Sequence, residues 1–491
     1  MFGKGISKLA KIFCVLIYLL PSVVSDSVAA EEPAEVEWVR TWGSAESRID
    51  SGQAVAVDYA GNTYVVGSFV EMIDFDPEDD IDPLHSNGGL DAYICKFDAN
   101  GEFLWGRAWG GSEWDTAIEV ALSKDGEPFV TGSFSETVDF DPGSDTDIRT
   151  SQGGRDAYVV KFNSNGEYQW VRTWGGSGMD RGTALEIDDS VNLYVTGQFQ
   201  EQVDFRPGQE IDEHTAEGVW NAFLLKLDDR GEFKWVCTWG GAGTASAWSI
   251  ALDNNENPYV VGKFNHTADF DPSQGIDMHS AVDEADAFLT RFDTLGNLTW
   301  ARTWGGAGYD SADGVTIDND GNVYVQGAFQ EAVDFDPGPD VVEREAAGIR
   351  DAFLTKFNPD GDLVWNVTRG LTGDYFGYDW LRGIAYSPPG SIFISGRYYG
   401  TVIFDPDSDT GKLISQGEWD AYMCEYNTDG DLIRTRTWGG TETDYCNDLA
   451  VDQNGLYVTG GFRSQGYYGL AQEDDFYSEG IYEAFLIKFV I

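Results

Sequence analysis

Two sets of aspartates recur at fixed places in this sequence, and carboxylates in such numbers could hold a cation. The first set stands shortly before a series of apolar runs: Asp50, Asp115, Asp180, Asp310, Asp379 and Asp444. Ala245 interrupts the series. Oxygen ligands of this kind suit Ca²⁺. Alternatively, each carboxylate accepts backbone N–H groups of its own glycine-containing turn. The local role is favoured because it explains why the residue is repeated.

The second set lies in a recurring Asp-Phe-Asp-Pro loop. Its members are Asp74 and Asp76, Asp139 and Asp141, Asp269 and Asp271, and Asp334 and Asp336, with Asp405 in a partial copy. Alternating acids are similar in composition to calcium loops, but none follows the EF-hand spacing. A calcium-stabilised loop and a solvated loop closed by Asx turns are therefore alternatives. Arg206 replaces the second acid of one copy and should weaken any site there.

Two aromatic loops near the C-terminus depart from the repeated pattern. One runs from Gly373 to Trp380 and the other from Gln465 to Tyr482. Their candidate ligand-binding residues, with one from an earlier loop, are Tyr375, Phe376, Tyr378, Trp380, Tyr467, Tyr468 and Trp114. Exposed aromatics with acids between them suit a glycan or a partner protein. Degeneration of the last repeats is the other explanation.

Catalytic signatures are harder to find. The four histidines are scattered, and the sequence contains no G-x-S-x-G, H-E-x-x-H or phosphate-loop motif. Paired acids of the glycosidase type cannot be singled out, because carboxylates are abundant everywhere. A non-catalytic scaffold is therefore expected, and a polysaccharide-acting enzyme, hydrolase or lyase, is the alternative. Calcium is the one cofactor that the residues suggest.

These residues sit in a unit of about 65 residues that is written repeatedly in tandem. In one copy, period-2 patterning predicts strands at 314–318, 322–329, 351–357 and from 363 onward, with turn residues between them. Two tight hairpins and one long loop predict a four-stranded antiparallel sheet. Such a sheet cannot bury both faces alone, whereas sheets arranged radially can.

The predicted fold is therefore an all-β, seven-bladed β-propeller with four antiparallel strands in each blade. The expected blades are 44–110, 111–175, 176–240, 241–305, 306–370, 371–439, and 440–491 together with 35–43. The chain ends in a third strand, and residues 36–43 resemble a fourth strand. The N-terminal strand is therefore expected to complete the last blade and close the ring, with the first acidic set around the channel mouth.

Most of the 17 Trp occur in a recurring W-x-R-T-W strand, as in Trp170, Arg172 and Trp174. Their spacing places all three side chains on one face of the strand. A sugar-binding platform is one interpretation, but recurrence in nearly every unit favours packing between blades. Cys95, Cys237, Cys424 and Cys446 show no metal-binding spacing, and buried free thiols are expected.

The motifs A-V-A-V-D, G-N-x-Y-V-x-G and W-x-R-T-W-G-G together resemble the SBBP-type β-propeller repeat of bacterial exported proteins, and more distantly the NHL repeat. The resemblance covers essentially residues 35–491. It implies an interaction scaffold without a common active site. It also implies that the A-V-A-V-D strand is innermost and the W-x-R-T-W strand outermost.

Charge and the N-terminus bear on location and partners. Basic residues, a short apolar run at 12–20 and small residues up to Ala30 predict a signal peptide over 1–30, and so a secreted or periplasmic protein without membrane insertion. The net charge of −53 disfavours nucleic acid as a partner. The partner is expected to be a protein or a glycan, while its identity and the oligomeric state stay open.

Overall fold

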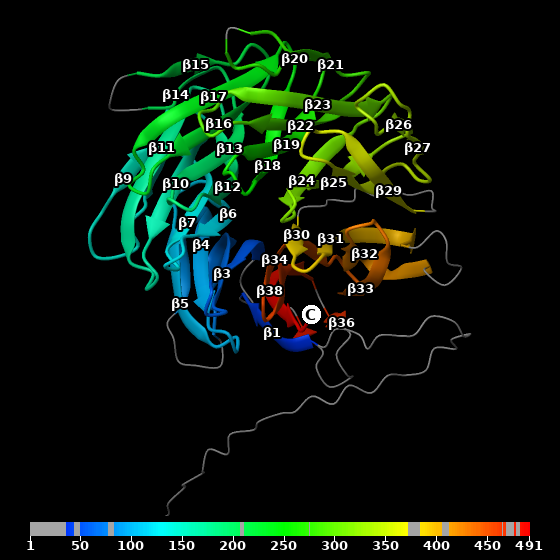
Figure 1. Ribbon diagram of the computed structural model, residues 1–491. Coiled ribbons are helices and arrows are strands. Elements are labelled where there is room, and N and C mark those ends of the chain that lie inside the picture. Colours follow the sequence, from blue (N-terminus) through cyan, green and yellow to red (C-terminus); the bar gives the residue numbers. More distant parts are fainter. Residues whose placement is uncertain are drawn as a thin grey trace, which may run out of the picture.

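The computed structural model describes residues 36–43, 50–76, 83–206, 211–273, 275–371, 383–404, 412–463, 465–467, 476–477 and 482–491. The regular elements of these residues are all β-strands. Figure 1 shows their sheets fanned around a common centre. The chain is therefore a β-propeller repeat protein, as the repeat predicted.

Five consecutive blades follow the predicted plan of four antiparallel strands. Their strands are β2 (Ser51–Val57), β3 (Thr63–Ile73), β4 (Leu84–Phe97) and β5 (Phe103–Trp109); β6 (Thr116–Leu122), β7 (Pro128–Phe134), β10 (Asp156–Phe162) and β11 (Tyr168–Gly176); β12 (Arg181–Ile187), β13 (Leu193–Phe199), β16 (Asn221–Leu227) and β17 (Phe233–Gly241); β18 (Ala245–Leu252), β19 (Pro258–Phe264), β22 (Asp286–Phe292) and β23 (Leu298–Gly306); and β24 (Ser311–Ile317), β25 (Val323–Phe329), β28 (Asp351–Phe357) and β29 (Leu363–Leu371). The last set lies close to the strands predicted for that copy.

Short hairpins follow the second strand of four of these blades. They are β8 (Thr137–Asp139) with β9 (Ile148–Thr150), β14 (Gln202–Asp204) with β15 (Glu213–Thr215), β20 (Thr267–Asp269) with β21 (Met278–Ser280), and β26 (Ala332–Asp334) with β27 (Glu343–Glu345). The sequence analysis treated these segments as loops. Three of the hairpins pair with the outer strand of the preceding blade, as β14 does at Gly175 and Gly176.

The remaining strands are arranged differently. They are β30 (Ile384–Ser387), β31 (Ser391–Ile403), β32 (Lys412–Asn427), β33 (Leu432–Gly440), β36 (Gln465–Tyr467) and β37 (Phe476–Tyr477), and then β34 (Tyr445–Asp452), β35 (Gly455–Phe462), β38 (Glu483–Phe489) and β1 (Val36–Trp42). The first group continues the sheet of β24, β25, β28 and β29, with β30 off its main path. The second forms a sheet in the order β1-β38-β35-β34.

The prediction of a seven-bladed propeller with four antiparallel strands in each blade is therefore wrong. Strand pairing divides the described chain into sheets of 4, 6, 6, 6, 4, 10 and 2 strands, and five blades keep the regular plan. The physical reason is that the Gly-Gly end of an outer strand offers backbone groups, and the next hairpin pairs with them. The predicted ring closure is not confirmed; what is observed is that β1 pairs with β38, from Val36 to Trp42.

The core lies between neighbouring blades, and the W-x-R-T-W strand supplies much of it. Trp109 is 2% exposed, and its ring centroid lies 5.4 Å from that of Phe162 in the next blade. Arg172 donates from Nε to the Gly231 carbonyl of the next blade at 3.0 Å. Packing between blades, the favoured interpretation of this motif, is therefore confirmed.

Two further observations concern the whole described chain. The four cysteines described are free and buried, as predicted. Among the described residues, no helix has the length and apolar character needed to cross a bilayer.

Candidate binding site at the mouth of the central channel

The first acidic set lies at the start of the innermost strands, where four of its carboxylates cap backbone groups. Asp115 accepts the N–H groups of Gly111 at 2.7 Å and Ser135 at 2.9 Å. Asp180 and Asp310 make the same pair of contacts, and Asp444 accepts from Gly440 at 2.7 Å. Asp50 is likewise fully buried, whereas Asp379 lies outside the described residues. This geometry corresponds to the turn-cap alternative.

A second row of acids, which the sequence analysis missed, stands at the start of the third strands. Asp156 accepts the N–H of Gln152 at 3.1 Å and lies against Gly175, where a Cβ would come within 2.2 Å of its carboxyl carbon. Four of these acids interact electrostatically with an acid of the first set, in the pairs Asp91–Asp115, Asp156–Asp180, Asp286–Asp310 and Asp420–Asp444. Burial, opposed by backbone hydrogen bonds and reinforced by Asp156, raises the pKa of Asp180 to about 7. Burial raises the pKa of Asp156 to about 6.

One blade junction lacks both acids. Ala245 takes the place of the first acid and Asn221 that of the second. The backbone contact survives, because the Ala245 N–H donates to the Trp220 carbonyl at 2.8 Å, as the Asp180 N–H does to that of Arg155 at 2.7 Å. Loss of the two carboxyls together removes the repulsion between them and leaves the junction neutral.

The described Asp-Phe-Asp-Pro loops are closed by Asx turns. Asp139 accepts the N–H groups of Asp141 and Asp147, and Asp141 accepts that of Gly143. Equivalent bonds recur for Asp74, Asp204, Asp269 and Asp334, with Asp271 and Asp336 acting as Asp141 does. Asp405 lies outside the described residues.

The predicted calcium site stays a prediction. Across the described parts of the chain, no three acidic, histidine or cysteine side chains form a group that could hold a metal ion. Because the loop acids bond their own backbone, the alternative of a polysaccharide-acting enzyme gains no support from them.

Most of the predicted aromatic residues lie outside the described residues, namely Tyr375, Phe376, Tyr378, Trp380 and Tyr468. Tyr467 is placed by its backbone, which pairs with Gly439. Trp114 is fully described. Its side chain is 56% exposed, and the Arg155 guanidinium lies 5.5 Å from the centre of its ring.

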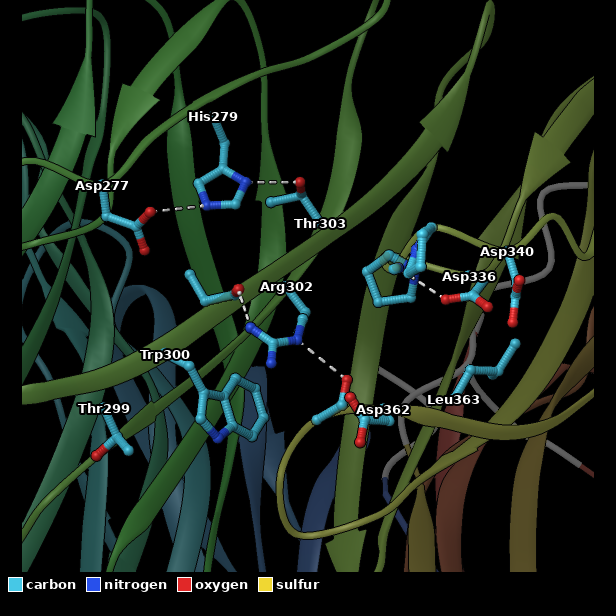
Figure 2. Close-up of a pocket in the computed structure, with 15 residues that line it drawn as sticks. Asp277, His279, Thr299, Trp300, Arg302, Thr303, Asp336, Asp340, Asp362 and Leu363 are labelled. Carbon is cyan, nitrogen blue, oxygen red and sulfur yellow. Dashed lines mark hydrogen bonds and ion pairs between the residues drawn. The ribbon is translucent and has the colours of Figure 1, made fainter.

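A groove of about 700 Å³ lies at the rim of the propeller, between β23 and the loop that contains Asp336. Figure 2 shows that its polar side chains contact one another: His279 bridges Asp277 and Thr303, and Arg302 lies beside Trp300. Arg302 also donates to the carbonyls of Asp360 and Gly361 in the next blade. These are the interblade contacts of the repeat, so the groove follows from blade packing.

A second cavity, of about 480 Å³, opens where the innermost strands begin, and we name it the mouth cavity. Its lining residues come from several blades: Gln53, Ile118, Glu119, Arg181, Thr183, Gln198, Val219, Trp220, Thr244, Ser246, Trp248, Ser249, Lys263, Asp313, Asn447 and Asp448. Glu119, Ser249 and Asp448 also line a cavity of about 350 Å³ further along the innermost strands. The two cavities thus share part of their wall.

Cations and aromatic rings alternate around this end of the propeller. The distances from cation to ring centre are 5.4 Å for Arg181 and Trp220, 5.1 Å for Lys263 and Trp248, 4.2 Å for Lys263 and Tyr309, 4.8 Å for Arg350 and Tyr309, and 4.8 Å for Arg397 and Trp419. With Trp114 and Arg155 they define the mouth face. Carboxylates lie among these cations, because Glu119, Asp313 and Asp448 also line the mouth cavity.

Lys263 is the cation whose surroundings are most unusual. Its ammonium group contacts the Tyr309 hydroxyl and lies over the rings of Trp248 and Tyr309. Burial and the positive charge of Arg350, opposed by Asp313, together lower the pKa of Lys263 to about 8. The protonated lysine is therefore held where additional negative charge would stabilise it.

These residues carried a signal that the sequence analysis did not use. At the place of Trp248, five other copies have Gln53, Ile118, Thr183, Asp313 and Asn447, and at the place of Trp220 they have Leu90, Arg155, Ala285, Arg350 and Trp419. Neither tryptophan belongs to the repeated pattern. Their difference from the other copies becomes visible only when the strand positions of the repeats are compared copy by copy.

The chain has distant relatives among known proteins. No family model matches it. The WD repeat-containing protein L264 of Acanthamoeba polyphaga mimivirus is 23% identical over 433 residues, which are 74% of this chain and 31% of that protein. The regulatory protein FlaEY of Caulobacter vibrioides is 27% identical over 282 residues, which are 53% of this chain and 27% of that protein. The chain spans less than a third of the length of these curated relatives.

Solved structures match the chain at low similarity. The WD40 β-propeller domain of Doa1 matches with a TM-score of 0.41 and 9% identity, over 93% of this chain and 96% of that domain. The extracellular region of Plexin A4 matches with a TM-score of 0.39 and 8% identity, over 93% of this chain and 47% of that one. The fold assignment rests on the strand pairing described above, and the repeat is not assigned to a narrower family.

Proposed function

We propose that this chain is an exported, non-catalytic β-propeller that binds a protein or glycan partner at the mouth face. The observation that carries the proposal is the mouth cavity itself, in which Trp220 and Trp248, each paired with a cation, line about 480 Å³ at the entrance to the channel. Cavities of this size with aromatic walls and a few polar groups are the usual form of a ligand site.

The proposal is supported by the difference between these tryptophans and those of the repeat. The second Trp of each W-x-R-T-W strand is buried between blades and therefore has a structural role, as Trp174 shows at 2% exposure. Trp220 and Trp248 are partly exposed and face a cavity. The WD repeat named for the viral relative agrees with a role in binding.

A capture experiment with matched variants tests the proposal. The chain is immobilised and exposed to the extracellular fraction of its own organism and to a glycan array. The double variant W220A/W248A should lose at least tenfold of the retention of a specific component, because both rings leave the cavity. Y59A is the control, since Tyr59 is 79% exposed in the turn after β2, at the other end of the channel.

The outcomes are distinct. Retention that W220A/W248A loses and Y59A keeps supports the mouth face as the binding surface. The proposal is contradicted if W220A/W248A still retains the component. It is also contradicted if the wild-type chain retains no specific component. Both variants should unfold within a few degrees of the wild-type melting temperature, because partly exposed side chains contribute little to the core.

A further inference from the structure

The wall of the mouth cavity carries charges of both signs. Its charged lining residues are two cations, Arg181 and Lys263, and three carboxylates, Glu119, Asp313 and Asp448. These charges act on one another, since the negative charge of Asp313 stabilises the protonated form of Lys263. A ligand with a net charge of either sign would therefore meet a like charge within the same cavity.

The two tryptophans of the wall stand apart from the hydrophobic core. The clusters of packed apolar side chains include repeated tryptophans such as Trp170, but among the described residues they include neither Trp220 nor Trp248. Both rings are partly exposed, and each already has a cation over it, Arg181 over Trp220 and Lys263 over Trp248. A cationic ligand group would be repelled there, whereas the exposed ring surface suits an apolar face of a ligand.

The uncharged polar side chains of the wall are held in place by bonds to neighbouring sheets. Thr183 and Asn447 donate to backbone carbonyls of another sheet at 2.7 and 2.8 Å, and Ser249 accepts a backbone N–H of another sheet at 3.3 Å. In these positions the side-chain oxygens of Thr183 and Asn447 can still accept, and the Ser249 hydroxyl can still donate. The wall therefore combines fixed acceptors and donors, and a hydroxyl group is the ligand group that serves both.

The fold brings the ring surfaces and the polar groups together. Trp220 immediately precedes β16 of one blade, and Trp248 lies in β18 of the next blade. Ser246 of β18 lines the cavity with them, and Gln53 and Asn447 reach it from other blades. The same ligand can therefore contact both rings and the polar groups that accompany them.

We infer that the mouth cavity binds a short uncharged saccharide, with the C–H faces of its sugar rings on Trp220 and Trp248 and its hydroxyl groups on the polar wall. The inference rests on the proposed function, and it names the ligand class for that site. A saccharide suits the cavity because the C–H groups of a sugar ring form an apolar face, while the hydroxyl groups at its edge donate and accept hydrogen bonds. A purely apolar ligand would displace water from the polar wall without replacing its hydrogen bonds.

Isothermal titration calorimetry with matched probes tests the inference. The neutral probes are short β-1,4-linked oligomers of glucose and of mannose. Their charged counterparts, with the same linkage, are oligomers of glucuronate and mannuronate, which carry carboxylates, and of glucosamine, which carries ammonium groups. At least one neutral oligomer should bind, and its charged counterparts should bind at least tenfold more weakly.

Ionic strength provides a second readout. The affinity for the neutral probe should change less than about twofold between about 0.05 M and 0.5 M sodium chloride, because the ligand has no charge for the salt to screen. An affinity that falls about tenfold over this range would show that attraction between charges holds the ligand, and would contradict the inference.

Variants assign the binding to the cavity. W248A should weaken the neutral probe at least tenfold, whereas W248F, which keeps a smaller ring, should weaken it only about threefold. Y59A is again the control, since Tyr59 is exposed in the turn after β2, at the other end of the channel. Its affinity should equal that of the wild type, and equal losses in Y59A and W248A would reject the cavity as the site.

Three further results would overturn the inference. They are the absence of binding by both neutral probes, equal or tighter binding of a charged counterpart, and wild-type affinity in W248A. If no neutral probe binds although W220A/W248A still loses a captured component, the proposed function stands and the saccharide is rejected. Failure of the capture experiment together with the absence of saccharide binding would reject both.

Discussion

The junctions between blades bury individual aspartates and so change their pKa values. Asp156 and Asp180 come from the third strand of one blade and the innermost strand of the next, and each is nearly fully buried. Their backbone hydrogen bonds stabilise the charged forms, but burial outweighs them, so the pKa of each is raised. The repeated acids thus bind protons near neutral pH.

The raised pKa of Asp180 makes the stability of the fold depend on pH. The folded pKa of Asp180 is about 7, above the value near 3.9 of an unfolded aspartate, so the folded state binds more protons between these values. The contribution is complete below about pH 4 and is lost as pH rises through about 7. The free energy of unfolding should therefore fall between about pH 5 and pH 8.

The variant Asp180→Asn tests whether Asp180 causes this pH dependence. Removing the titrating group should reduce the fall in unfolding free energy over that interval by about 2 kcal/mol, whatever it does to stability at a single pH. Urea denaturation at both pH values measures this slope. Asp125→Asn, in an exposed turn, should leave the slope unchanged. An identical slope in Asp180→Asn and the wild type would contradict the assignment.

At the scale of elements, the turn between the third and fourth strands couples neighbouring blades. Gly166 has φ +76°, and a Cβ there would lie 2.8 Å from the Trp105 ring of the preceding blade. Trp105 also donates from Nε1 to the Ser164 carbonyl at 3.3 Å in the same turn. The turn needs glycine both for its backbone conformation and for this close approach.

Gly166→Ala should therefore lower the free energy of unfolding by about 1–3 kcal/mol, from the left-handed conformation and the displaced ring together. Gly390→Ala is the matched control. Its Cβ would meet the Thr428 methyl at an ordinary 3.6 Å, and its φ is outside the left-handed region. Thermal and urea unfolding of both variants measure the difference, and equal losses would refute the role given to the turn.

The strand β1 protects the edge of β38. Its register runs from Val36–Phe489 to Trp42–Ala484, and Arg40 donates to the Gly101 carbonyl in another blade. A chain that begins at residue 44 should be several kcal/mol less stable than one that begins at residue 36, since it exposes the edge and loses Trp42 from the core. It should also self-associate, which sedimentation velocity would detect. A monomer of unchanged stability would contradict this prediction.

At the scale of the whole molecule, net charge should control stability. At a net charge of −53, the negative charges of the folded chain repel one another, and salt screens that repulsion. Raising sodium chloride from about 20 mM to about 500 mM should raise the melting temperature. Sucrose is the control, because it favours compact states without screening charge. A melting temperature that responds to sucrose but not to salt would count against the electrostatic explanation.

The sequence alone was enough to predict the features that recur within each repeat. Strand positions, the packing role of Trp174, the buried thiols and the caps at Asp115 follow from spacing within one copy. Pairing across blade boundaries was not predictable in this way, because β14 joins an outer strand that lies earlier in the chain. The mouth cavity was missed for the same reason, since residues as distant as Gln53 and Asn447 meet there only after the blades are arranged radially.

The neutral junction of Asn221 and Ala245 lies directly beside the mouth cavity. Trp220 and Ser246 are their immediate neighbours, and both line the mouth cavity. The acidic junctions respond to pH, whereas this junction has no carboxyl in either position. The proposed binding surface is thus built on the one described junction that acidification leaves chemically unchanged. A propeller organised in this way gains stability in acidic surroundings while the geometry of the proposed site stays constant.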